Sequence, residues 1–342
     1  MSEQLAPESA SALPPTAPRE HGWRGVVLAV LAFIAVPLMG PVRLAAPVEQ
    51  TLILLVPAIA VCTLVGWWAG GRLSLAVIWC ALAAWMLMQP VSLDAAYGNL
   101  ARGWALVLAT SFGIVSLAAP KLRLFPRALG AVALALAGGI VMLLIASTTG
   151  DSVVELLRAQ YARRVADSMT FTGTADWQRM AAEHSDLSDA IKVAGERMLT
   201  WIDPAVLLAP AFLALQSLLT LALAWSVYHR VARVRLGLPL SPLKEFRFND
   251  QLVWGVIVGI VSALFPALAD LRSFGLNLLL FFGALYALRG LGVLAFLLPG
   301  RFATAMLISA TLLFPLVGAF ALGLGLGDTW LDWRSRARPT TN

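Results

Sequence analysis

The chain has 342 residues, of which 59% are hydrophobic and only 13% are charged. Soluble domains are about 45–50% apolar and about 25% charged. The mean hydropathy of this chain is +0.80. Helices that are apolar all round need lipid or a very large interior, so the composition excludes a single water-soluble core and predicts an integral membrane protein.

The formal net charge is +6 and the isoelectric point is about 9.9. In a membrane protein such a basic balance is typical of cytoplasmic loops, so we expect the lipid bilayer as partner and no nucleic acid. The two cysteines, Cys62 and Cys80, lie inside apolar runs, and the three histidines are scattered. This pattern predicts no disulfide framework, no metal site and no cofactor.

Apolar runs long enough to cross about 30 Å of hydrocarbon recur along the chain and do not alternate as β-barrel strands would. The sequence therefore predicts an all-α, polytopic transmembrane helix bundle of eight or nine spans. Residues 23–149 are expected to hold the N-terminal transmembrane helices and 204–327 the C-terminal ones. The predicted spans are 24–41, 51–69, 73–90, 103–120, 128–149, 204–227, 251–269, 274–298 and 302–326.

Segment 274–298 leaves the number of spans open, because it contains Arg289-Gly290 and fits either a full span or a broken, re-entrant helix. The choice decides on which side the basic C-terminal tail, 328–342, lies. Residues 1–22 are polar and rich in Pro, Ala and Ser without the pattern of a secretory signal, which predicts a disordered cytoplasmic tail.

Basic residues in the short loops predict which side each loop faces. Twelve of them fall on the side of the amino terminus and three on the other side. The amino terminus is therefore expected in the cytoplasm of a cell-membrane protein, and residues 150–203 on the outer side. The three residues on the outer side are Arg43, Arg102 and Arg272.

Residues 150–203 form a polar insert in which apolar residues recur at helical spacing, as in Val153, Leu157, Tyr161 and Val165. Ser152 and Glu155 match a capping box. The pattern predicts two amphipathic helices that lie on the outer membrane face. They would serve either as a solvated connector or as a lid over a cavity.

Strongly polar residues inside a span are costly and often functional. Asn277, Tyr286 and Arg289 all fall in 274–298, and no acidic residue lies inside another predicted span, since Asp270 and Asp328 are at span ends. Arg289 is therefore expected beside water, carbonyl groups or an anionic ligand. These three residues are the candidate substrate-binding residues, with Asn277 at the mouth of a polar cavity. In the competing interpretation, Arg289 reaches the cytoplasmic interface and only anchors its helix.

The sequence contains no familiar hydrolase or nucleotide-binding motif, so no catalytic residues are expected and the chain is predicted not to be an enzyme. The fragments Gly325-Leu326-Gly327-Asp328 and Pro266-Ala267-Leu268 resemble parts of intramembrane aspartyl proteases. They occur in the opposite order to that family, and its Tyr-Asp pair is missing. An intramembrane enzyme stays a distant third hypothesis.

Four stretches of the C-terminal half resemble the YybS-like family of predicted bacterial polytopic membrane proteins, a domain of unknown function. They are Pro242 to Arg247, Asn277-Leu278, Arg289-Gly290 and Leu326 to Arg334. Gly290, Asp328, Asp332 and Arg334 are the family-signature residues, while Arg289 stands where the family tends to have glutamine. The family is distantly similar to the S components of energy-coupling-factor transporters, which implies binding of a small molecule.

We therefore expect an inner-membrane protein that binds or transports a small-molecule ligand, with a separate ATPase or other membrane subunit as partner. The alternative is a non-transporting scaffold or envelope-assembly protein. A polar cavity near 274–298 would favour the first, and a filled bundle interior would favour the second.

The predicted sidedness can be tested with single cysteines at positions 123 and 235 in a variant that lacks Cys62 and Cys80. Both positions should resist an impermeant thiol reagent in intact cells and react after permeabilisation, because both fall in basic loops. Labelling of either position in intact cells would refute this orientation.

Overall fold

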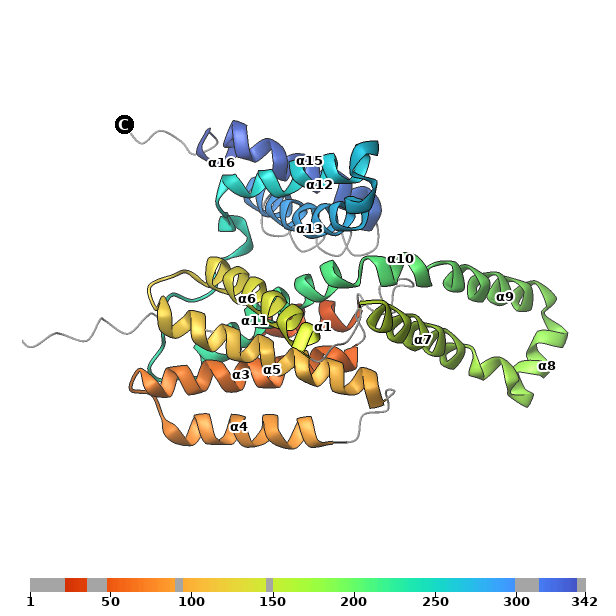
Figure 1. The fold of residues 1–342 in the computed structure, drawn as a ribbon, viewed down its shortest axis with the longest axis horizontal. Coiled ribbons are helices and arrows are strands. Elements are labelled where there is room, and N and C mark those ends of the chain that lie inside the picture. The colour runs from red at the N-terminus through yellow and green to blue at the C-terminus, as the bar shows by residue number, and fades with distance from the viewer. Residues whose placement is uncertain (1–21, 36–47, 90–94, 146–149, 299–313, 337–342) are drawn as a thin grey trace, which may run out of the picture.

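The computed structural model describes residues 22–35, 48–89, 95–145, 150–298 and 314–336, and these segments are helical, with no β-strand among them. Figure 1 shows two groups of helices and a helical arm. The predicted tail 1–22, the end of the first span, the start of the last span and the end of the C-terminal tail fall largely outside these residues. The all-α prediction is confirmed for the part of the chain that the structure describes.

The first group contains most of the buried core. Phe112 and Leu221 are fully buried at its centre, together with Ala131 and Ala135, which lie four residues apart on one helix. Small residues at that spacing let helix backbones approach closely. The helices of this group are α1 (Arg24–Ala35), α3 (Val48–Trp68), α4 (Leu73–Met88), α5 (Ala95–Ala118), α6 (Leu124–Ile145) and α11 (Ala209–Val231).

The second group packs beside the first. It consists of α12 (Val253–Leu264), α13 (Arg272–Leu297), α15 (Phe314–Leu331) and the short α16 (Trp333–Arg336), with the 3-10 turns η3 (Leu243–Glu245), η4 (Asp250–Leu252) and η5 (Pro266–Leu271). Gly259 of α12 lies against Leu279 and Gly275 of α13. Because α13 is one continuous helix, the interpretation of 274–298 as a broken segment is wrong.

Five helices among the described residues are long and apolar enough to cross a membrane, namely Gln50–Trp68, Ala96–Ala118, Leu124–Ile145, Ala209–Val231 and Pro266–Leu297. Three further apolar helices, Leu73–Met88, Asp250–Leu264 and Leu316–Leu331, are shorter. The chain is therefore a helical membrane protein with several apolar helices. The higher count of eight or nine spans remains a prediction.

The predicted insert is an arm that projects from one end of the bundle (Figure 1). It comprises α7 (Gly150–Ser168), η2 (Thr170–Gly173), α8 (Ala175–Glu183), α9 (Ser185–Thr200) and α10 (Ile202–Leu207). The turns that join α3 to α4 and α5 to α6 lie at the opposite end. The arm continues away from the bundle, whereas the sequence predicted helices lying flat across its end.

The apolar residues of the arm explain this difference, because they pack on one another. Tyr161 and Val165 of α7 form a small core with Ile202, Ala205 and Val206 of α10, and Leu157 and Met198 pack against it. Burial in this core raises the pKa of the Tyr161 phenol above its usual value, so this side chain stays neutral. The base of the arm is thus a folded unit with its own apolar contacts.

Candidate functional site

Four charged side chains meet where α13, α15 and the segment before α12 come together, and we call them the ion cluster: Asp250, Arg289, Asp328 and Arg334. The Arg289 Nε donates to Asp328 Oδ2 at 3.0 Å, and its Nη1 donates to Asp250 Oδ1 at 2.6 Å. Arg334 Nη2 donates to the same Asp328 oxygen at 2.7 Å. The side chains of Arg289 and Arg334 are each 3% exposed and that of Asp328 is 0% exposed.

The guanidinium groups also hold backbone carbonyls. Arg289 Nη2 donates to the carbonyl of Asp328 at 3.2 Å, so all three of its nitrogens are hydrogen-bonded. Arg334 Nη1 donates to the carbonyls of Lys244 and Phe246 at 3.2 and 3.0 Å. The Asp250 side chain is 60% exposed, so three of the four charges are buried, and the two carboxylates together balance the two guanidiniums.

Two glycines bring α13 and α15 close enough for these bonds. A Cβ atom on Gly290 would collide with the carbonyl oxygen of Ala321, and one on Gly325 would collide with that of Tyr286. Neither position can carry a side chain without separating the helices. Glycine at 290 is therefore a packing requirement that places Arg289 beside Asp328.

The segment 242–250 fastens the cluster to the first helix group through aromatic rings. Phe248 lies under the Arg289 guanidinium, 5.5 Å from ring centroid to Cζ, and packs edge-on against Tyr286. Phe246 and Phe248 both contact Phe125 at the start of α6. Arg247 forms an outer pair with Asp332, which follows α15 in a left-handed backbone conformation with φ 40°.

Asn277 lies on the same helix as Arg289 but outside the ion cluster. Its Oδ1 accepts from the backbone N–H of Ala211 at 2.9 Å, and its Nδ2 donates to the carbonyls of Leu207 and Ser273 at 2.8 and 2.9 Å. Leu207 ends α10 and Ala211 lies in the first turn of α11, so Asn277 satisfies backbone groups freed at the break between these helices. Both of its donor hydrogens and its acceptor are engaged.

The structure thus separates the three candidate substrate-binding residues. Tyr286 and Arg289 lie together beside Phe248, and Asn277 binds the α10–α11 break. The expectation that Arg289 lacks a carboxylate partner is wrong, because Asp328 at the end of one apolar helix and Asp250 just before another both reach it. The sequence placed both aspartates outside the predicted spans. Hydropathy does not show which helix ends lie next to one another, so it could not bring these aspartates to Arg289.

The family-signature residues, by contrast, converge. Gly290, Asp328, Asp332 and Arg334 all take part in the ion cluster or border it. The sequence reasoning missed Asp250 and Gly325. The spacing of Ala321 and Gly325, four residues apart on α15, is a small-residue signal that could have revealed the close crossing.

The two carboxylates of the cluster do not form a protease-like pair. Such a pair shares a proton between two acids that repel each other. Here Asp250 and Asp328 are each bonded to Arg289, and Asp328 is also bonded to Arg334. The arrangement is chemically suited to holding segments together.

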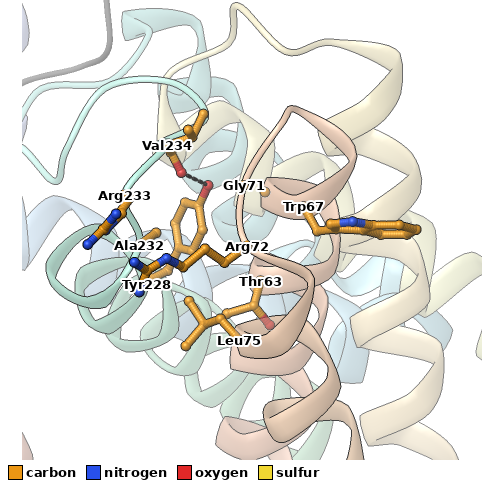
Figure 2. Close-up of a pocket in the computed structure, with 10 residues that line it drawn as sticks. Thr63, Trp67, Gly71, Arg72, Leu75, Tyr228, Ala232, Arg233 and Val234 are labelled. Carbon is orange, nitrogen blue, oxygen red and sulfur yellow. Dashed lines mark hydrogen bonds between the residues drawn. The ribbon is translucent and has the colours of Figure 1, made fainter.

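A shallow pocket lies elsewhere, at the end of α3 (Figure 2). It is small and open to solvent, and Arg72 and Arg233 line it together with Tyr228 and Thr63. None of the three candidate substrate-binding residues borders this pocket. The sequence reasoning assigned its arginines only to basic loops.

The geometry defines a multi-pass helical membrane protein in which two of the four family-signature residues, Asp328 and Arg334, belong to a buried ion cluster. Residues 27–329 match the family described as "Predicted membrane protein (DUF2232)", and the chain belongs to this family. No curated protein and no solved structure matches the chain significantly. The family description gives the membrane class and no activity.

The ion cluster can be tested with Asp328→Asn. This substitution keeps the side-chain volume but leaves two buried guanidiniums without their shared anion, a change that typically costs about 3–5 kcal/mol. We expect a large drop in the midpoint of thermal unfolding of the purified protein in detergent.

Asp332→Asn is the matched control, because it removes the same charge from a half-exposed pair with Arg247. Exposed pairs contribute about 0–1 kcal/mol, so the midpoint should change little. Equal losses for both variants would contradict a dominant role of the buried cluster.

The close helix crossing predicts that Gly290→Ala is destabilising by about 1–3 kcal/mol or more, because the new methyl group overlaps the Ala321 carbonyl. On the same helix, a methyl group added at Gly283 would meet no atom within 4 Å, so Gly283→Ala should be neutral or slightly stabilising. The two variants are compared by thermal unfolding in the same detergent. A neutral Gly290→Ala would show that the helices can separate without cost.

Proposed function

We propose that this protein is a non-transporting membrane scaffold. The observation that carries the proposal is the state of Arg289, whose three nitrogens are all bonded to Asp250 and Asp328. A buried arginine with free donors would have indicated an anionic ligand. Here the chain itself supplies the anions.

The other candidate ligand residues support the same conclusion. Asn277 uses its hydrogen-bonding groups on the α10–α11 break, and Tyr286 packs against Phe248. The residues that would have formed a small-molecule site therefore join helices to one another. Asn277 links the two helix groups at the arm end of the bundle, whereas Arg289 joins elements of the second group to one another at the opposite end.

A scaffold also needs a surface for its partner, and we assign this role to the arm. Its base is ordered by the Tyr161 core, whereas Phe171, Val193 and Leu199 expose 43%, 52% and 53% of their surface. A folded arm that projects from the bundle and carries apolar side chains fits contact with another protein of the cell envelope. In the alternative function, transport of a small molecule, the arm would act as a lid.

The proposal predicts that a photoreactive amino acid at Val193 forms a cross-link to one discrete protein in intact cells. The same amino acid at Leu316, which is 75% exposed on α15, is the control for random neighbours in the bilayer. The supporting result is a specific product from position 193 that disappears when the other exposed large apolar residues of α9, Leu187 and Leu199, are replaced by serine.

A second experiment replaces residues 152–200 with a flexible segment of equal length. The scaffold function should be lost in a complementation assay while the bundle still inserts in the membrane. Full complementation by this variant, or a solute flux that depends on the chain in proteoliposomes, would overturn the proposal.

A further inference from the structure

The pocket of Figure 2 lies at the level where two candidate spans end. Gln50–Trp68 and Ala209–Val231 both finish beside it, and the exposed Trp68 follows directly on the pocket residue Trp67. Tryptophan prefers the headgroup layer of a bilayer. The pocket therefore opens at the depth of lipid headgroups, on the side predicted to be cytoplasmic.

Three segments that meet at this end carry positive charge without any acidic residue. Residues 62–73, 119–128 and 225–241 contain seven basic side chains: Arg72, Lys121, Arg123, Arg127, Arg230, Arg233 and Arg235. Tyr228 and Trp225 connect the segments, since Tyr228 lines the pocket and Trp225 stacks on Arg127. The electrostatic potential here must be strongly positive.

The arginines at the pocket differ from those of the ion cluster. Arg72 and Arg233 are exposed to solvent, border the same pocket and have no hydrogen bond or ion pair within the described part of the chain. The buried Arg127 lies outside the pocket lining and donates from Nη2 to the carbonyls of Pro120 and Leu122, while its Nε and Nη1 find no partner among the described residues. No carboxylate among these residues compensates this guanidinium.

The N-terminus of α4 adds to the attraction for an anion. The helix α4 begins at Leu73 without a side-chain cap, so the N–H groups of its first turn are left for another acceptor beside Arg72. This helix terminus is a supporting observation, and the inference rests on the pocket and its two arginines.

We propose that this pocket binds the phosphate group of an anionic phospholipid. Arg72 and Arg233 would donate to the phosphate oxygens from two sides, as guanidinium groups do in charge-assisted pairs. Basic pockets between transmembrane helices on the cytoplasmic side are suited to such headgroups. Lipids whose headgroup carries its own cation should bind less well, because the surrounding arginines repel that cation.

The test uses the purified full-length chain in neutral detergent, titrated with short-chain phosphatidylglycerol or phosphatidylcholine. Arg72→Gln/Arg233→Gln removes the two pocket donors. The matched control, Lys121→Gln/Arg123→Gln, removes the same charge from exposed positions at the same end outside the pocket. The proposal predicts that Kd for phosphatidylglycerol rises about tenfold or more in the pocket variant and less than about twofold in the control.

Thermal unfolding in neutral detergent checks that both double variants fold, and Arg233→Gln alone provides a milder variant with a smaller rise in Kd. An equal loss in the two double variants would mean that the basic surface attracts lipid without a site. Equal affinity for the two lipids would also overturn the proposal. The last comparison adds inorganic phosphate at millimolar concentration as a competitor of the lipid. If phosphate competes and the protein shows no preference between the two lipids, the pocket binds a free anion and the lipid assignment is wrong.

Discussion

The shared anion Asp328 is the interaction on which the second helix group depends. Its Oδ2 accepts from Arg289 and Arg334, and these arginines in turn hold Asp250 and the carbonyls of Lys244 and Phe246. Arg289, Arg334 or Asp328 alone would be too costly to bury as an unpaired ion, so these three buried charges stabilise one another. One buried carboxylate thereby fixes α13, the end of α15 and the segment that precedes α12 relative to one another.

The ion cluster can form only because α13 and α15 cross closely at Gly290 and Gly325. This close contact alone would not determine where along the two helices they cross. Gly290 and Gly325 let the backbones touch, which is the main source of helix association where no hydrophobic driving force exists. The ion pairs then select one register of this contact, because a shift of one turn would leave charges unpaired. Packing and charge thus have complementary roles: glycine permits the approach, and Asp328 decides where it occurs.

The helical membrane class followed directly from the apolar runs, and α13 coincides closely with the predicted 274–298. Hydropathy could not reveal which span ends meet, so it could not pair Arg289 with Asp328 or Asp250. The same limit applies to Asn277, whose partners are backbone groups at a helix break that no side-chain pattern marks.

The insert was correctly predicted as helical, but the sequence could not show whether its apolar faces pack on the membrane or on α10. The resemblance to a family gathered Gly290, Asp328, Asp332 and Arg334 before their contacts were known, and the structure brings them together.

A buried guanidinium needs an anion or a full set of acceptors, and the buried arginines Arg289 and Arg127 meet this need differently. Arg289 finds two carboxylates and a backbone carbonyl within the chain, so all three of its nitrogens have an acceptor. Arg127 has two carbonyls and the face of Trp225 at 4.8 Å, with two nitrogens left over and only basic residues in the adjoining segments. In the lipid complex proposed above, a headgroup phosphate bound by Arg72 and Arg233 would bring an anion to this basic end of the bundle, and it would do so only with the pocket at the membrane surface. Internal pairs would then fix the shape of the bundle, and the lipid-facing arginines would fix its depth.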